Sequence, residues 1–108
     1  MKYIDCHTHT QFSMDSEADI NAMIERAIEL DLAAYAVTDH CECSTWYPKE
    51  HYQNADLFDH FNYAEDFRHS VEAVTELKEQ YGSRINLICG TELGQSTQDI
   101  EAAKLAAS

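Results

Sequence analysis

The chain has 108 residues and a formal net charge of -13, from 20 acidic and 7 basic side chains. A surface this negative repels phosphate backbones and anionic lipids, so polyanion binding is disfavoured as a main role. A hydrophobic fraction of 44%, with only three glycines and one proline, excludes a disordered chain and allows at most one domain with a modest core.

The N-terminal segment and the cysteines indicate the cellular compartment. The first apolar stretch is too short for a signal peptide, and no run approaches the roughly 18 apolar residues of a membrane span. The cysteines lack the regular spacing of a disulfide framework, so we expect reduced thiols at Cys6, Cys41, Cys43 and Cys89. We therefore expect a cytoplasmic protein without a membrane partner.

Strand and helix patterns alternate along the chain. Apolar residues fall at helical spacing up to Leu30, after a potential N-cap at Ser16 or Asp19. Residues 32–38 are almost continuously apolar, which is typical of a strand covered on both faces. In chain order we predict a strand at 2–6, a helix at 19–30, a strand at 32–38, an irregular excursion at 41–62, a helix at 63–81, a strand at 84–89 and a helix at 98–107.

This order of elements predicts a parallel sheet. Right-handed crossovers turn successive strand and helix units into parallel strands covered by helices. No repeat, low-complexity stretch or linker divides the chain, so residues 1–108 belong to a single domain. Three parallel strands leave unpaired edges, which an independent domain rarely tolerates. We therefore expect an incomplete domain whose C-terminal part is missing.

Residues that commonly bind metals follow each predicted strand. His7 and His9 follow the first strand, Asp39 and His40 the second, and Glu92 the third. Because the carboxyl ends of parallel strands share one face, these side chains should converge in one cleft. Alternate residues of an extended chain project to the same side, so the His-x-His pair can reach one ion. The two oxygens of Glu92 could bridge a pair of ions.

Asp15, in the polar loop QFSMDSE, offers a further oxygen ligand. Each residue also has a structural interpretation when taken alone: a surface His-x-His pair, a turn capped by Asp39 and His40, or a solvated Glu92. The presence of such residues after all three strands favours a metal site.

Three segments carry a family resemblance: IDCHTHT at 4–10, TDHCE at 38–42 and GTELG at 90–94. Together they resemble the first three motifs of the PHP (polymerase and histidinol phosphatase) superfamily, particularly its histidinol-phosphatase branch. The resemblance implies an α/β fold, the N-terminal portion of a distorted (β/α)7 barrel with parallel strands. It also implies hydrolysis of phosphate esters with up to three divalent ions, which are zinc, manganese or iron.

The same resemblance implies which residues bind the ions. His7 and His9 would bind one ion, and Glu92 would bridge it to a second. Asp15 and His40 would hold a third. Family members complete these sites with later histidines and an Asp-x-His motif, which do not occur after Glu92 in this sequence. We therefore expect residues 1–108 alone to be inactive.

Two other groups of residues near the motifs have competing interpretations. Asp5 and Asp39 could orient the ligand imidazoles, or could equally be turn residues at strand ends. The run HCEC offers the thiols Cys41 and Cys43 beside His40 for a separate zinc site, against which free thiols are the simpler interpretation.

Histidines and basic residues elsewhere are less informative. Lys49 and Arg68 could contact a substrate phosphate, although surface charge explains them as well. His51, His60 and His69 are expected to be solvated rather than ligands.

Our first functional hypothesis is a histidinol-phosphatase-like enzyme, whose complete form converts L-histidinol phosphate to L-histidinol and phosphate in histidine biosynthesis. The long excursion rich in Tyr and His supports that branch, and the partner would be a small phosphorylated substrate rather than nucleic acid. The alternatives are another PHP phosphoesterase, such as a nuclease or a protein-tyrosine phosphatase, and a non-catalytic metal-binding module.

Overall fold

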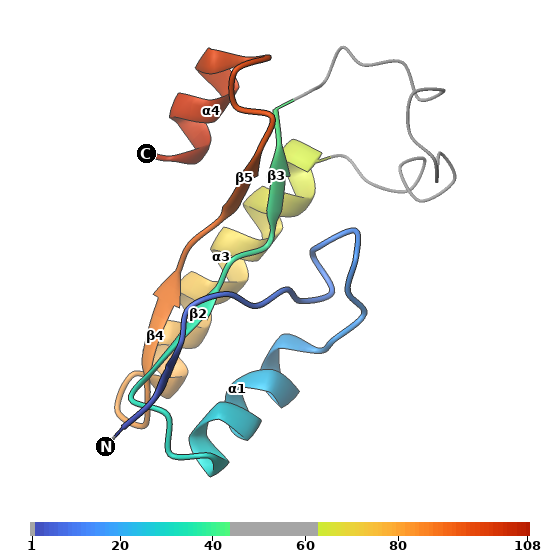
Figure 1. Ribbon diagram of the computed structural model, residues 1–108. Coiled ribbons are helices and arrows are strands. Elements are labelled where there is room, and N and C mark those ends of the chain that lie inside the picture. Colours follow the sequence, from blue (N-terminus) through green and yellow to red (C-terminus); the bar gives the residue numbers. More distant parts are fainter. Residues whose placement is uncertain (1, 44–62) are drawn as a thin grey trace.

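The computed structural model describes residues 2–43 and 63–108 (Figure 1). Strands and helices alternate, and all strand pairs among these residues are parallel, as the sequence predicts. The elements are β1 (Ile4–Asp5), α1 (Ile20–Glu29), β2 (Ala34–Val37), β3 (His40–Glu42), α3 (Tyr63–Tyr81), β4 (Asn86–Cys89), β5 (Glu92–Gly94) and α4 (Ile100–Ala106).

The described strands form two parallel ladders, which lie end to end in Figure 1. The first has the order β1-β2-β4 and the second pairs β3 with β5. Only two residues separate β2 from β3 and two separate β4 from β5. Backbone hydrogen bonds continue across this gap, from the Gly90 amide to the Val37 carbonyl at 2.9 Å and from the Glu92 amide to the Asp39 carbonyl at 3.1 Å. The two ladders are therefore successive parts of the same strand pair.

This continuation corrects the sequence prediction, which ended the second and third strands at residues 38 and 89. His40 and Glu92 lie within β3 and β5 rather than in loops, and they are register partners. The polar character of residues 38–42 obscured the strand, because a strand is recognised from sequence by its apolar pattern.

Helix α1 begins at Asp19, whose carboxylate accepts a hydrogen bond from the Ala22 amide at 2.9 Å. This N-cap satisfies one of the free amides of the first turn. Ile20, Ile24 and Ala27 follow at helical spacing and are all buried. Of the two N-caps that the sequence allows, the structure therefore uses Asp19.

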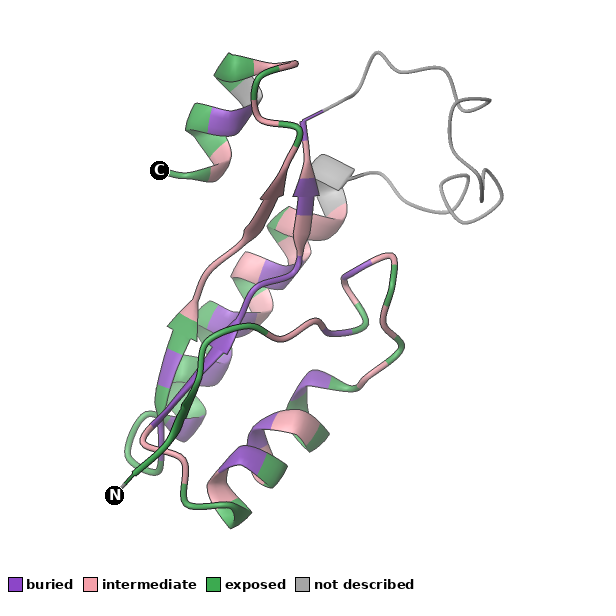
Figure 2. Cartoon of the chain, viewed as in Figure 1, coloured by how far each residue is buried: buried purple, intermediate pink, exposed green. Residues whose placement is uncertain are grey.

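One continuous core lies between the helices and one face of the first ladder. Helix α3 runs behind both ladders, and α1 lies beside it (Figure 1). The buried residues gather where these helices meet β2 and β4 (Figure 2). The core cluster consists of Ile20, Ile24, Ala27, Tyr35, Val37, Val74, Leu77, Tyr81, Ile85 and Leu87. Burial of this surface fixes the ladders against the two helices.

The opposite face of the first ladder is more open. Ile4 is 58% exposed and Ile88 is 38% exposed, and the strand register puts both on the face away from the core. None of the helices in the described part of the chain combines the length and apolar character that a membrane crossing requires.

Candidate metal centre

Buried Asp39 anchors the loop that follows β1. Its side chain is 0% exposed and accepts three hydrogen bonds: from the Thr10 amide at 2.6 Å, the Thr10 hydroxyl at 2.8 Å and the Ser70 hydroxyl at 2.6 Å. The Ser13 hydroxyl in turn accepts a hydrogen bond from the His40 amide at 2.9 Å. These bonds tie the loop to the start of β3 and to α3. Residues 9–15 are thereby held over the junction of the two ladders.

The first group of ligand-type residues meets at one oxygen of Glu92. Its Oε2 lies 3.0 Å from Nε2 of His7 and 2.8 Å from Nε2 of His9. The two rings have a centroid separation of 4.9 Å. As the alternation of an extended chain predicts, the His-x-His pair therefore projects to the same side.

A second group shares the His9 ring. Nδ1 of His9 lies 2.8 Å from Oδ2 of Asp15, and Nε2 of His40 lies 3.4 Å from the same oxygen. Oε2 of Glu92 is 3.8 Å from Nε2 of His40, so the two groups adjoin. The structure thus brings together all five predicted ligands, from the loop after β1 and from β3 and β5.

The spacing of these atoms fits divalent ions. Ligand atoms about 2.1 Å from a tetrahedral ion are about 3.4 Å from one another, which lies within the range of 2.8 to 3.8 Å found here. Nε2 of His9 is buried and makes no directed hydrogen bond, although Oε2 of Glu92 is 2.8 Å away. An unpaired nitrogen in a buried position is costly unless something binds it. Nitrogen and carboxylate donors in this arrangement suit zinc, manganese or iron.

The electrostatics of the group also favour a cation. Burial acts to lower the pKa of His9, but its hydrogen bond to Asp15, the charge of Asp15 and the nearby Glu92 outweigh burial and raise it above 6.5. Burial acts to raise the pKa of Asp15, and its hydrogen bond to His9 with the fields of His9 and His40 lowers it below 3.8. The carboxylates of Asp15 and Glu92 therefore favour positive charge at His9, which a metal ion would also supply.

The two carboxylates expected to orient imidazoles have other contacts among the described residues. Asp5 accepts a hydrogen bond from the backbone amide of His7 at 3.3 Å, not from its ring. Both oxygens of Asp39 are occupied by Thr10 and Ser70. Both aspartates therefore act on the backbone and hydroxyls around the site, which is closer to their alternative interpretation as turn residues.

A carboxylate that the sequence interpretation missed does contact a ring. Oε1 of Glu42 lies 2.9 Å from Nδ1 of His40, and both side chains are largely buried, at 14% and 18% exposed. The i and i+2 spacing of these residues in a strand would have indicated that they share a side. The sequence prediction ends the strand before residue 40 and therefore does not pair His40 with Glu42.

The HCEC thiols lie away from this cluster. In β3 the side chain of Cys41 alternates with those of His40 and Glu42, and it is buried. The candidate metal-binding groups among the described residues contain neither Cys41 nor Cys43. All four cysteines are free, as predicted.

The remaining candidates do not join the cluster. Arg68 pairs with Glu72 at 2.6 Å and contacts His69 at 3.2 Å, all on helix α3. Lys49, His51 and His60 lie outside the described residues.

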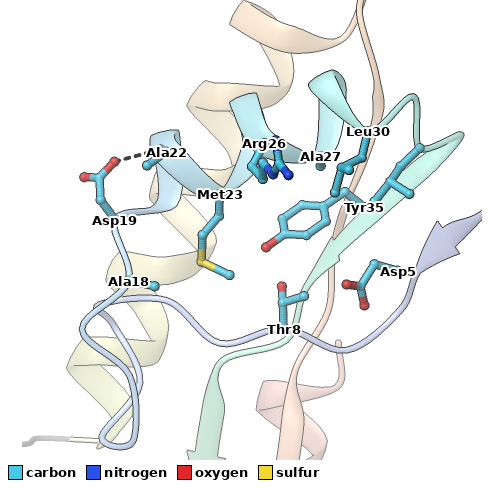
Figure 3. A pocket seen from close by; sticks show the side chains of 11 residues that line it. Asp5, Thr8, Ala18, Asp19, Ala22, Met23, Arg26, Ala27, Leu30 and Tyr35 are labelled. Atoms are coloured by element: carbon cyan, nitrogen blue, oxygen red, sulfur yellow. Dashed lines mark hydrogen bonds between the residues drawn. The ribbon is translucent and has the colours of Figure 1, made fainter.

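A separate cavity of about 440 Å³ lies between α1 and the strands β1 and β2. It is lined mainly by apolar side chains and includes none of the five predicted ligands. Figure 3 shows the hydroxyl of Tyr35 pointing into it, near Met23 and Thr8. That hydroxyl is buried and has no hydrogen-bond partner among the described residues. The cavity therefore lacks the charged groups of the metal cluster.

Fold and site together define an α/β protein with a candidate metal centre where its parallel strands deliver histidines and carboxylates. The sequence model of the PHP domain matches residues 5–107. The chain therefore belongs to the PHP domain family, which confirms the resemblance noted in the three motifs.

Two curated relatives have the same description. A probable histidinol-phosphatase of Schizosaccharomyces pombe is 30% identical over 94 residues, which cover 82% of this chain and 29% of the relative. A probable histidinol-phosphatase of Thermotoga maritima is 34% identical over 64 residues, which cover 59% of this chain and 24% of the relative. The chain thus spans less than a third of the length of these relatives.

A solved structure shares the fold. The histidinol phosphate phosphatase of Lactococcus lactis, crystallised with zinc, L-histidinol and phosphate, matches 99% of this chain with a TM-score of 0.72 and 20% identity. The chain covers 36% of that protein. At this identity the likeness bears on fold alone. It confirms the predicted class, α/β with parallel strands as in part of a (β/α)7 barrel.

Proposed function

We propose that the complete protein is a metal-dependent phosphoesterase that hydrolyses a small phosphorylated substrate, L-histidinol phosphate. The observation that carries the proposal is the convergence of the His7 and His9 rings on one carboxylate oxygen of Glu92. Asp15 and His40 lie beside this group. Two curated relatives that are probable histidinol-phosphatases support the choice of substrate.

Each proposed ligand has a defined part. His7 and His9 would hold one ion through Nε2, and Glu92 would supply a carboxylate to that ion and a second one. Asp15 and His40 would hold a further ion through Oδ2 and Nε2. When bound, divalent ions neutralise phosphate charge and make water acidic enough to act as a nucleophile near neutral pH.

The acidic balance of the chain makes these ions necessary for substrate binding. With a net charge of -13, residues 1–108 repel a phosphate ester unless cations reverse the sign locally. The cavity beside α1 offers one cation, Arg26, which is paired with Glu29 and shares the lining with the carboxylates of Asp5 and Asp19. The ligand cluster is therefore the better place for the phosphate. We accordingly propose a cytoplasmic enzyme that acts on a small metabolite and binds neither nucleic acid nor membranes.

We also propose that residues 1–108 are part of one PHP domain and are inactive by themselves. Each candidate group offers three protein ligands among the described residues. The ion beside Asp15 and His40 has few ligands of its own, because His9 and Glu92 already belong to the first group. Further ligands from the rest of the domain would complete it, as the coverage of the relatives suggests.

The test compares phosphate release by the complete protein from L-histidinol phosphate, phosphotyrosine and an oligonucleotide. We expect a clear preference for L-histidinol phosphate, loss of activity in His9→Ala and full activity in His69→Ala, a histidine on α3 that is not in the cluster. Equal rates on the three substrates would contradict the choice of substrate. Activity that survives both His9→Ala and metal chelation would contradict the metal-dependent mechanism.

A second candidate, a non-catalytic metal-binding module, draws on the same three-ligand groups. It predicts that metal binds tightly while none of the three substrates is hydrolysed.

A further inference from the structure

We propose that Glu42 is a positioning residue that fixes the tautomer and orientation of His40, and that Gly94 provides the space which the Glu42 carboxylate needs. The inference deepens the proposed metal centre and rests on His40 belonging to it. Glu42 meets the cluster at Nδ1 of His40, and Gly94 lies against the Glu42 carboxylate, so both act through His40.

The short strand β3 brings the two side chains together. His40 and Glu42 are two residues apart, so they project to the same side of the strand. Oε1 of Glu42 lies 2.9 Å from Nδ1 of His40, the length of a good hydrogen bond. Within residues 2–43 and 63–108 this is the one hydrogen bond of the Glu42 carboxylate. Because the Glu42 carboxylate is largely buried and has this single partner, its position is tied to the His40 ring.

The other nitrogen of His40 faces the cluster. Its Nε2 is 3.4 Å from Oδ2 of Asp15 and 3.8 Å from Oε2 of Glu92. These distances exceed the 2.9 Å at Nδ1, so the proton of the neutral ring belongs on Nδ1, where Glu42 accepts it. That tautomer leaves the Nε2 lone pair free for a metal ion.

The carboxylates of Asp15 and Glu92 compete with Glu42 for the proton of the His40 ring. Without an acceptor at Nδ1, the carboxylates of Asp15 and Glu92 would attract the proton to Nε2 of His40. An N–H group there would block metal binding until the proton moved. The carboxylate on the far side of the ring therefore keeps the binding nitrogen open before any ion arrives.

Gly94 is the register partner of Glu42 across the β3 and β5 ladder. A Cβ atom at Gly94 would overlap the carboxylate of Glu42, and all three of the nearest atoms belong to that carboxylate. Among the described residues no glycine has a positive φ, so space rather than backbone conformation is the reason for glycine here. Because the carboxylate ends a flexible side chain, Gly94→Ala would push it away from His40 without breaking the strand.

The first experiment reads the tautomer directly. In the metal-free complete protein, long-range ¹H–¹⁵N correlation spectra at a pH where the rings are neutral report which nitrogen of His40 carries the proton. We expect the proton on Nδ1 in the natural protein. Glu42→Gln keeps it there, because an amide oxygen still accepts. Glu42→Ala and Gly94→Ala shift it to Nε2, whereas Glu79→Ala, an exposed carboxylate on α3, changes nothing.

The second experiment titrates zinc into the same proteins. Partners that orient metal-binding histidines typically contribute 10-fold to 100-fold in affinity, so we expect about that loss in Glu42→Ala and Gly94→Ala and a smaller one in Glu42→Gln. The double variant Glu42→Ala with Gly94→Ala should bind zinc no more weakly than Glu42→Ala alone, because no carboxylate remains to be displaced.

The outcomes separate this inference from the proposed function. An unchanged His40 tautomer in Glu42→Ala overturns the positioning role. If Gly94→Ala lowers zinc affinity as much in the Glu42→Ala protein as in the natural protein, Gly94 does not act by giving space to the Glu42 carboxylate. If the natural protein binds no zinc while the tautomers change as described, the metal centre is refuted and the role of Glu42 is supported.

Discussion

His40 and Glu92 are direct register partners in the parallel ladder of β3 and β5, with Nε2 of His40 3.8 Å from Oε2 of Glu92. The two residues are far apart in the sequence, and the ladder brings them together. Their position within strands rather than loops gives the cluster a rigid support. Sites supported by regular elements hold their ligands more precisely than sites on loops.

Because the two ligand groups share only His9, single substitutions should separate them. Asp15→Asn keeps the shape of the side chain and removes the charge. It should weaken the ion beside His40 more than the ion at His7 and Glu92, which Asp15 reaches only through Nδ1 of His9. Glu92→Gln should weaken the latter by more than about 100-fold, since even partners outside the ligand set contribute 10-fold to 100-fold. Zinc titration against a competing chelator gives both affinities. Equal losses at both ions in Asp15→Asn would contradict the division into two groups.

Asp39→Asn should destabilise the protein. Its side chain accepts three hydrogen bonds while fully buried, and an amide would place a donor against the donors of Thr10 or Ser70. We expect a loss of about 1–3 kcal/mol in the free energy of unfolding, measured by urea denaturation. The control Asp31→Asn alters an exposed ion pair with Lys2. It should change the free energy of unfolding by less than about 1 kcal/mol. Equal effects of the two substitutions would contradict the anchoring role of Asp39.

The Cys41 thiol should resist alkylation. Burial, with the neighbouring Cys43 and Glu42, raises the pKa of Cys41 to about 11. Below that pH the thiol keeps its proton, so at pH 8 only about one molecule in a thousand carries the reactive thiolate. Iodoacetamide followed by mass spectrometry should label the exposed Cys6 and leave Cys41 unmodified until the protein is unfolded. Labelling of both at similar rates in the folded protein would refute this.

Tyr35→Phe should not reduce stability. The Tyr35 hydroxyl is buried without a partner in good hydrogen-bond geometry among the described residues, and burial outweighs its interaction with the Thr8 hydroxyl to raise its pKa above the usual value. Removing an unsatisfied buried group relieves part of a desolvation cost of about 1–3 kcal/mol, so the free energy of unfolding should stay the same or rise. Tyr3→Phe, at a residue 69% exposed, serves as the neutral control. A clear loss of stability would indicate that the cavity beside α1 holds a partner for the hydroxyl.

The sequence predicts the order of the strands and helices, and the meeting of the ligand residues, from a few apolar patterns. The apolar run at residues 32–38 and the helical stripe ending at Tyr81 fix the order of strands and helices, and the topology of parallel strands then brings His9 and Glu92 together. The predicted helix termini at Asp19 and near Tyr81 agree with the structure. These elements were predictable because local propensity and burial favour the same conformation.

The strand extensions were not predictable in the same way. Residues 38–42 are largely polar and lack the apolar pattern of a strand. Residues 40–42 form strand β3 only because they pair with residues 92–94. For the same reason Glu42 was missed as the partner of His40. The sequence leaves open whether Asp39 orients an imidazole or is a turn residue. In the structure its carboxylate accepts hydrogen bonds from Thr10 and Ser70, a choice that depends on tertiary packing.

The most direct test is the metal content of the purified protein, measured by elemental analysis per chain. We compare the natural sequence, the double variant His7→Ala with His9→Ala, and His69→Ala as a control outside the cluster. Bound zinc, manganese or iron in the natural protein and in His69→Ala, but not in the double variant, is the predicted result. A folded natural protein without metal, or equal metal in all three proteins, would contradict the proposed centre.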